Sequence, residues 1–307
     1  LGAVGAAAAC ARALRLSETQ TAHAISLATS RAAGFMSQFG TETKPLHSGF
    51  AASGGVEAAL FARAGITAGS ETLHGPTGLR TLMVGPDVDT LAESMVGKAE
   101  HGQTVTFRDE DVGDPLHILH HGLKIKRFPN CGSVHRALDG LLELREMHAL
   151  SADDVASIHV RAPAAHLRNL MYEMPETPAE AKFSLEYNLA VGLMRGDVGL
   201  ENFEPQQISR ADIRSLYPII TKDYVEALES DFPTEVHIQT KDGRRFETRR
   251  AMPVGSREHP LTDAQILAKF ENCARATTSF ENGEALAKTF RSLESNMPVR
   301  QISSLMT

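Results

Sequence analysis

The spacing of apolar residues predicts that the first third of the chain is helical. Small apolar residues predominate in the first 16 positions. Ser17-Glu18-Thr19-Gln20 is a typical N-cap for a second helix, whose alanines recur at helical spacing. We expect helices over 1–16, 19–33, 55–64 and 87–96. The stretch 41–55, which carries a proline and several glycines, is interpreted as an irregular segment that interrupts the helical pattern.

The middle of the chain alternates apolar and polar residues as strands do, with helical segments between them. A polar, turn-rich stretch over 98–114 precedes it. We expect strands over 116–119, 123–128, 155–160, 235–240 and 245–249, and helices over 133–148, 178–195, 210–219, 262–276 and 281–293. The last two strands form a hairpin around Asp242-Gly243. This order indicates a helical domain interrupted by a smaller α+β domain.

Charge and cysteine content narrow the possible partners. The 307 residues carry a formal net charge of −7, whereas nucleic-acid binding needs a clustered excess of Lys and Arg, so we expect no nucleic-acid partner. The 3 cysteines are far apart and show no CxxC spacing, which disfavours a disulfide framework and is typical of a reducing cytoplasm. No apolar run approaches the roughly 18 residues of a membrane span, so we expect no membrane partner.

The first candidate site lies in the stretch 41–55. Lys44 and His47 flank Pro45, and the glycines that follow let another group approach closely. The alternative is a buried loop, which would account for the proline and the glycines. It would not explain why Lys44 and His47 lie between them. We therefore interpret this stretch as part of a binding or catalytic site.

The second candidate site lies between 126 and 135. Lys126, Arg127 and His135 gather around a proline and a glycine, where an acidic protein could receive a carboxylate-rich ligand. The alternatives are a solvated strand edge for the cations and simple packing at a helix start for His135. Cys131 stands four residues before His135, but no third orienting group is evident, so a small buried cysteine is favoured over a nucleophile.

Other motifs give weaker signals. His117, His120 and His121 cluster, but no carboxylate or cysteine falls where it would complete a metal site, so we expect no metal. The chain lacks GxGxxG and GxxxxGK[ST], the glycine patterns that cradle nucleotide phosphates. Tyr187 could face a ligand from its helix, or its ring could fill the core.

Three segments in order resemble the MmgE/PrpD family. They begin with GTETKPLHSG at 40–49, KRFPNCGSVH at 126–135 and KFSLEYNLAV at 182–191. The family includes 2-methylcitrate dehydratases, cis-aconitate decarboxylases and iminodisuccinate epimerases. The resemblance runs nearly from end to end of the chain.

The resemblance implies a mainly α fold with an α+β part. A large all-helical domain would contain 1–114 and 256–307, and a smaller α+β lid domain, 115–255, would be inserted near its C-terminal end. The resemblance further implies a homodimer, no metal or organic cofactor, and a di- or tricarboxylate substrate. It also implies that a family segment with an acidic residue and histidines precedes Leu1, so we expect an N-terminally truncated chain and leave open whether it is active alone.

Site roles follow from the resemblance residue by residue. The implied catalytic residues are His47, Lys126, His135 and Tyr187. The implied substrate-binding residues are Lys44, Arg127, Cys131 and Ser133. The resemblance implies that Lys44, His47, Lys126 and His135 serve one ligand.

The family's reactions share a carbanion or enolate that forms next to a carboxylate. Lysines would hold carboxylates, while His47 or His135 would move the proton. We expect a cofactor-independent hydro-lyase that dehydrates a 2-methylcitrate-like acid. The alternatives are an epimerase or isomerase, a decarboxylase, and a catalytically incomplete homologue that only binds carboxylates. Decarboxylases of the family carry a histidine where this chain has Cys131, which disfavours decarboxylation.

Overall fold

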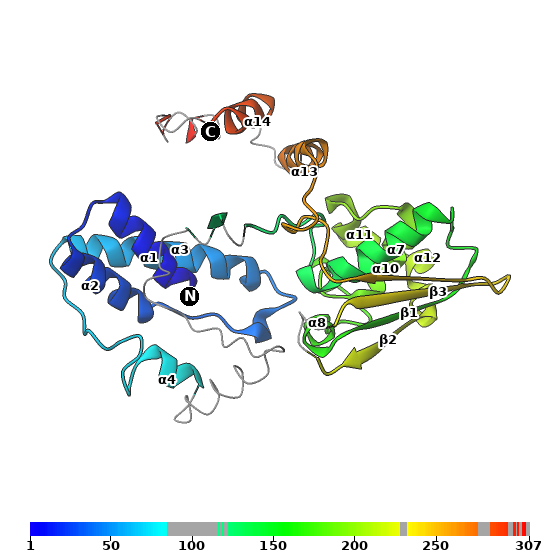
Figure 1. Cartoon of the computed structure of the whole chain (residues 1–307), viewed down its shortest axis with the longest axis horizontal. Coiled ribbons are helices and arrows are strands. Elements are labelled where there is room, and N and C mark those ends of the chain that lie inside the picture. The colour runs from blue at the N-terminus through cyan, green and yellow to red at the C-terminus, as the bar shows by residue number, and fades with distance from the viewer. Residues whose placement is uncertain are drawn as a thin grey trace. The chain divides into compact units, whose positions relative to one another are not determined.

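The computed structural model describes the chain in two compact units, Leu1–Asp109 and Glu110–Thr307 (Figure 1). The described residues are 1–84, 116, 118–119, 122–227, 232–275, 283–293, 297–298, 300 and 303–304. Each unit is considered by itself. The expected helix over 87–96 and the polar stretch over 98–114 lie outside the described residues.

The first unit is helical. Its elements are α1 (Gly2–Ala13), α2 (Glu18–Thr29), a 3-10 turn (Met36–Gln38), α3 (Thr43–Arg63) and α4 (Leu79–Val84). Ser17 caps α2 as expected: its hydroxyl accepts from the Gln20 N–H, and the Gln20 side chain accepts from the Ser17 N–H. Helices α1, α2 and α3 pack together on alanines, and the buried ones are Ala3, Ala7, Ala11, Ala24, Ala28, Ala58, Ala59 and Ala62.

The predicted break before residue 55 is wrong. Helix α3 runs through it without interruption from Thr43 to Arg63. Pro45 falls in the first turn, where a backbone N–H has no partner within the helix and its loss is tolerated. A Cβ on Gly55 would lie 2.4 Å from the Ala6 Cβ, so Gly55 is where α1 approaches α3. The approaching group that the glycines admit here is a helix.

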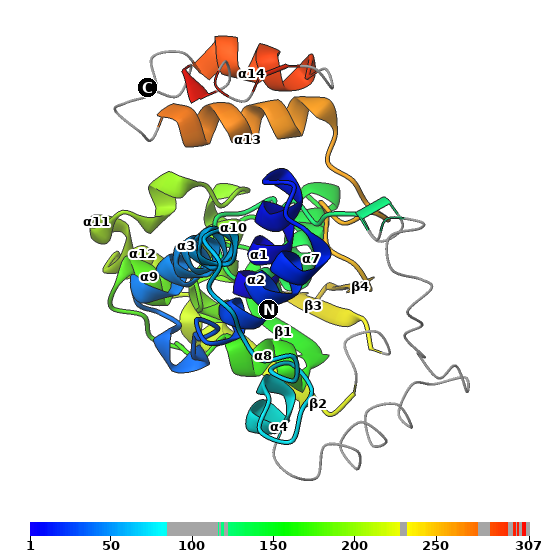
Figure 2. The same cartoon turned by 90° about the vertical axis from the view of Figure 1, so that its left-hand side faces the viewer.

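The second unit mixes helices with a sheet. Its helices include α7 (His135–Met147), α8 (Ala164–Asn169), α9 (Pro178–Ala181), α10 (Leu185–Arg195), α11 (Pro205–Ile208), α12 (Ala211–Arg214), α13 (Asp263–Arg275) and α14 (Gly283–Arg291). Short 3-10 turns are Gly132–Val134, Leu200–Phe203 and Tyr217–Ile219. The strands are β1 (Val155–Pro163), β2 (Ile220–Val225), β3 (Thr234–Thr240) and β4 (Arg245–Arg250). Helices α13 and α14 lie side by side (Figure 2).

The four strands form one mixed sheet in the order β2-β1-β3-β4. β1 pairs with β2 in parallel, whereas the β1–β3 and β3–β4 pairs are antiparallel. Helices α7 and α10 lie over the sheet (Figure 1), and α7 packs on β3 and β4. Gly140 of α7 allows this contact, since a Cβ there would lie 3.0 Å from Val236. The core of this unit consists mainly of leucine, isoleucine and valine, with some alanine and aromatic side chains.

Most of the expected elements in this unit are confirmed, and four expectations are wrong. Residues 118–119 are helical, and residues 123–126 have no regular secondary structure because the segment does not join the sheet. The expected helix over 178–195 breaks at 182–184, where the Ser184 hydroxyl caps α10. The expected helix over 210–219 is instead α12 followed by a 3-10 turn.

Strand β2 had no counterpart among the sequence-based expectations. It is the parallel partner of β1, and Lys222 of β2 donates to Glu186 of α10 at 2.8 Å. The part of the chain that the structure describes contains no helix with the length and apolar character of a membrane span.

Candidate functional site

The segment that leads into α7 is fixed by hydrogen bonds to the α9–α10 junction. The Asn130 side chain donates to the Asn188 side chain at 2.7 Å, and Asn188 in turn donates to backbone carbonyls of Ala181 and Ser184. The Cys131 N–H donates to the Lys182 carbonyl at 2.9 Å. Buried hydrogen bonds of this kind hold a non-helical backbone in one conformation.

Lys126 lies along this segment. Its Nζ donates to the Asn130 carbonyl at 3.0 Å. A Cβ on Gly132 would lie 3.8 Å from the Lys126 Cε, an ordinary contact distance, so the lysine stem passes close to Gly132. The ammonium group is therefore held next to the start of α7.

Arg127 is held by a buried carboxylate. Its Nη1 donates to Asp139 Oδ1 at 3.3 Å, and its guanidinium lies 4.8 Å from the centroid of the Phe128 ring. The other oxygen of Asp139 accepts from the Val254 N–H at 2.8 Å. Burial raises the pKa of Asp139, and the hydrogen bond from Val254 and the charge of Arg127 oppose that rise.

His135 is the first residue of α7 and is buried. Its ring packs edge-on against Phe128, with the centroids 5.3 Å apart. Within the described residues its Nε2 has no hydrogen-bond partner. Burial lowers the pKa of His135 to about 3, with further lowering by the charges of Lys126, Lys269 and Arg127 and an opposing hydrogen bond to the Phe128 backbone. The imidazole is therefore neutral at physiological pH.

Cys131 and Ser133 are both half-buried beside His135. Cys131 packs against the hydrophobic core but is only partly buried, whereas a buried cysteine was expected. The Ser133 hydroxyl accepts from the Asn169 side chain at 3.1 Å. Both predicted substrate-binding roles stay predictions.

Tyr187 lies in the core. Its side chain is fully buried in the first turn of α10, next to Phe203, and its hydroxyl donates to the Asn202 carbonyl. Burial raises the pKa of Tyr187. These contacts favour the packing alternative for this residue, and its predicted catalytic role stays a prediction.

Lys44 and His47 lie in the first unit, in the first turns of α3. Their spacing of three residues puts them on one face of that helix. The Lys44 ammonium lies 5.1 Å from the centroid of the Phe39 ring. The His47 ring lies against Gly34, where a Cβ would be 3.3 Å from Nδ1. The helix, rather than the expected loop, pairs these two side chains.

The structure thus brings the predicted residues into two groups, one in each unit. Lys126, Arg127 and His135 gather at the start of α7, and Lys44 and His47 gather at the start of α3. Sequence reasoning missed Asp139, which holds Arg127, and Lys269 of α13, whose charge acts on His135. No local pattern signalled Lys269, because it reaches this region only through the path of the chain after β4.

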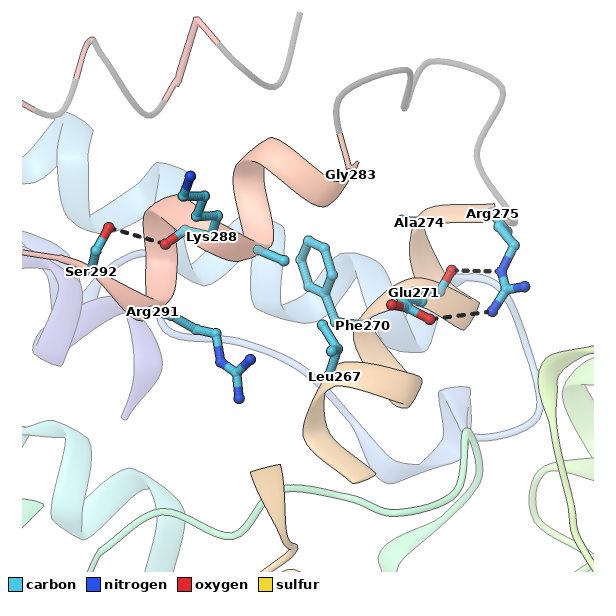
Figure 3. Close-up of a pocket in the computed structure, with 10 residues that line it drawn as sticks. Leu267, Phe270, Glu271, Ala274, Arg275, Gly283, Lys288, Arg291 and Ser292 are labelled. Carbon is cyan, nitrogen blue, oxygen red and sulfur yellow. Dashed lines mark hydrogen bonds and ion pairs between the residues drawn. The ribbon is translucent and has the colours of Figure 1, made fainter. Parts of the chain in front are cut away.

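A cavity of about 370 Å³ opens beside Arg127 and is also lined by Lys269 of α13. A second groove of about 730 Å³ lies between α13 and α14, where Phe270 points toward α14 (Figure 3). The apolar part of its lining, Leu267, Phe270 and Ala287, is suited to helix packing. The rest of the lining includes the charged residues Glu271, Arg275, Lys288 and Arg291. Among the described residues no group of three or more His, Cys, Asp or Glu could hold a metal ion, and the cluster of His117, His120 and His121 lies outside them.

Comparisons with known proteins place the chain in a family. The family model for the MmgE/PrpD C-terminal domain matches residues 128–295, and that for the MmgE/PrpD N-terminal domain matches residues 1–91. The chain belongs to the MmgE/PrpD family. The MmgE/PrpD N-terminal match contains Lys44 and His47, and the C-terminal match contains His135 and Lys269.

Relatives of this MmgE/PrpD chain include several cis-aconitate decarboxylases. The human enzyme is 27% identical over 302 residues, which cover 96% of this chain and 59% of the relative. A cis-aconitate decarboxylase-like protein, oryM, of Aspergillus oryzae is 25% identical, over 100% of this chain and 64% of its own length. The cis-aconitate decarboxylase of Aspergillus terreus is 24% identical, and the match covers 90% of this chain and 57% of the relative. The chain therefore spans about three fifths of the length of these curated relatives.

Proposed function

We propose that this MmgE/PrpD protein acts as a lyase on a small tricarboxylate. The observation that carries the proposal is the neutral, buried His135, whose Nε2 has no partner among the described residues and whose surroundings are cationic. Family membership and the names of the cis-aconitate decarboxylases support the class of substrate.

The geometry suggests how such a reaction would proceed. Lys126 and Arg127 would each hold one carboxylate of the substrate, so that negative charge lies next to His135. An anion there would offset the lysine charges that lower the pKa of His135 and would make its Nε2 a stronger base. His135 would then take the proton from the carbon next to the carboxylate, and the cations would stabilise the resulting carbanion or enolate.

The finer assignment that we propose is dehydration of a 2-methylcitrate-like hydroxy acid. In this reaction the carbanion would expel the hydroxyl group from the neighbouring carbon, and the protonated His135 would give its proton to the departing oxygen, so that water leaves. Decarboxylation of cis-aconitate is the second candidate, and the names of the relatives favour it. There the carbanion would form by loss of carbon dioxide, and His135, after taking up a proton from solvent, would deliver it to the carbon.

Proton-exchange NMR tests the proposal and separates these reactions. Full-length protein is incubated with 2-methylcitrate, cis-aconitate or iminodisuccinate in deuterated water, and products and deuterium uptake are followed. We expect turnover of one substrate and a loss of at least 100-fold in His135→Gln, in line with removal of a general acid–base group. His148→Gln is the matched control, since His148 lies at the other end of α7 and stacks on Phe246.

If no polycarboxylate shows turnover or deuterium exchange, the proposed enzymatic activity is refuted. The alternative of a homologue that only binds carboxylates then remains. The roles of Lys44 and His47 stay predictions, and Lys44→Met and His47→Gln test them in the same assay. The homodimer and the cytoplasmic location also stay predictions, the first open to sedimentation analysis and the second to cell fractionation.

A further inference from the structure

The 370 Å³ cavity beside Arg127 has a lining dominated by positive charge. It lies within the second unit, between the segment that carries Arg127, the turn at 197–200, and α13. Its charged and amide side chains are Arg127, Asp197, Gln265, Lys269, Asn272 and Arg275. Its volume falls within the range typical of small-molecule sites, about 300–1,000 Å³.

Two of the three cations in the lining already have carboxylate partners. Arg127 donates to Asp139 at 3.3 Å, and Arg275 lies 3.7 Å from Glu271 of the same helix. Lys269 forms no ion pair with any carboxylate among the described residues. It therefore contributes a positive charge that no ion pair within the described residues neutralises. Lys269 is half-buried, and a charge in such a position is screened less than in open solvent.

Lys269 also shares its electrostatic surroundings with the proposed reaction site. Its charge is one of those that act on the buried His135, together with Lys126 and Arg127. A ligand that spans both places would need more than one negative group. A tricarboxylate has this property, because a third carboxylate remains after two have met Lys126 and Arg127.

We propose that Lys269 forms a carboxylate subsite in this cavity and makes the protein select tricarboxylates over dicarboxylates. The inference rests on the proposed function for the class of ligand. Gln265 and Asn272, one turn to either side of Lys269 on α13, add amide donors for the same carboxylate. Asp197 opposes binding, since it brings a negative charge to the same lining.

A pair of unreactive ligands tests the subsite directly. Tricarballylate and glutarate share a five-carbon chain and differ by one carboxylate, so the ratio of their dissociation constants measures the contribution of the third group. Calorimetric titration of the full chain should show tighter binding of tricarballylate. Lys269→Gln should weaken the binding of tricarballylate about tenfold and leave the binding of glutarate nearly unchanged, as expected for the loss of one charged hydrogen bond.

Two further variants control this measurement. Asp197→Asn should tighten the binding of tricarballylate several-fold, because the substitution removes the opposing negative charge. Lys288→Gln removes a lysine from the other groove of the helix pair and should leave both constants unchanged. Thermal unfolding of each variant shows that the fold is retained.

The outcomes separate this inference from the proposed function. The subsite is refuted if Lys269→Gln keeps the wild-type ratio of the glutarate and tricarballylate dissociation constants. It is also refuted if the wild-type protein binds the two ligands equally or binds neither. Both conclusions hold whether or not the protein turns over a polycarboxylate. If Lys269→Gln loses the preference for tricarballylate over glutarate but no substrate is turned over, the subsite is supported and the proposed lyase activity is refuted.

Discussion

His135 is the residue whose chemistry depends most on its surroundings. In an unfolded chain an imidazole has a pKa near 6.5, whereas in the folded second unit burial and nearby cations lower the pKa of His135 to about 3. Between these values the unfolded chain binds the proton and the folded chain does not. The free energy of unfolding should therefore fall as the pH is lowered from about 6.5 toward 3.

We predict that this one residue contributes a slope of up to about 1.4 kcal/mol per pH unit to that fall. Urea unfolding of wild type and His135→Gln at several pH values measures the contribution, which the variant should lack. The ring-proton NMR signal of His135 should stay constant between pH 8 and pH 5. A titration midpoint near 6.5 would contradict the buried, neutral imidazole.

Among the elements, α3 shows most clearly how small residues decide a packing distance. A Cβ on Gly55 would lie 2.4 Å from the Ala6 Cβ and 2.6 Å from the Ala7 backbone nitrogen, which is closer than real Cβ contacts come. We predict that Gly55→Ala forces α1 away from α3 and costs about 1–3 kcal/mol of unfolding free energy, measured by urea denaturation.

Gly49 is the matched control in the same helix. A Cβ there would meet no atom within 4 Å. Gly49→Ala should stabilise the helix by about 0.5–1 kcal/mol, because alanine loses less conformational freedom than glycine on folding. Equal effects of the two substitutions would show that helix propensity, and not the approach of α1, sets the cost at Gly55.

At the scale of the whole molecule, the two units have cores of different composition. The first unit buries alanines between α1, α2 and α3, whereas the second buries leucine, isoleucine, valine and aromatic side chains between its sheet and helices. Larger apolar side chains remove more surface from water, at about 25 cal/mol per Å². The second unit therefore has the larger hydrophobic stabilisation.

We predict that backbone amides of α1, α2 and α3 exchange with deuterium at least tenfold faster than those of α7, α10 and β3. Local opening needs less free energy where fewer apolar contacts are lost. Hydrogen-exchange mass spectrometry of the chain at neutral pH measures the difference. Equal protection of α3 and α10 would contradict the argument from core composition.

Local sequence determined most of the elements and the composition of the two groups of site residues. Capping at Ser17, the Asp242-Gly243 hairpin and the leucine spacing of α7 act over a few residues, so they can be read without the fold. The charges and histidines at 44–47 and 126–135 were likewise visible as candidate sites. The proposal of a carboxylate ligand came from them and from the family resemblance.

The tertiary structure decided what neighbouring elements do to these residues. Only the approach of α1 shows that Gly55 serves helix packing, and only the core around α10 shows that Tyr187 is buried with its hydroxyl satisfied. The lowered pKa of His135 arises from burial and from the charges of Lys126 and Lys269, and Lys269 is far away in sequence. Desolvation and charge act through space, so their effect depends on distances that the order of residues does not contain.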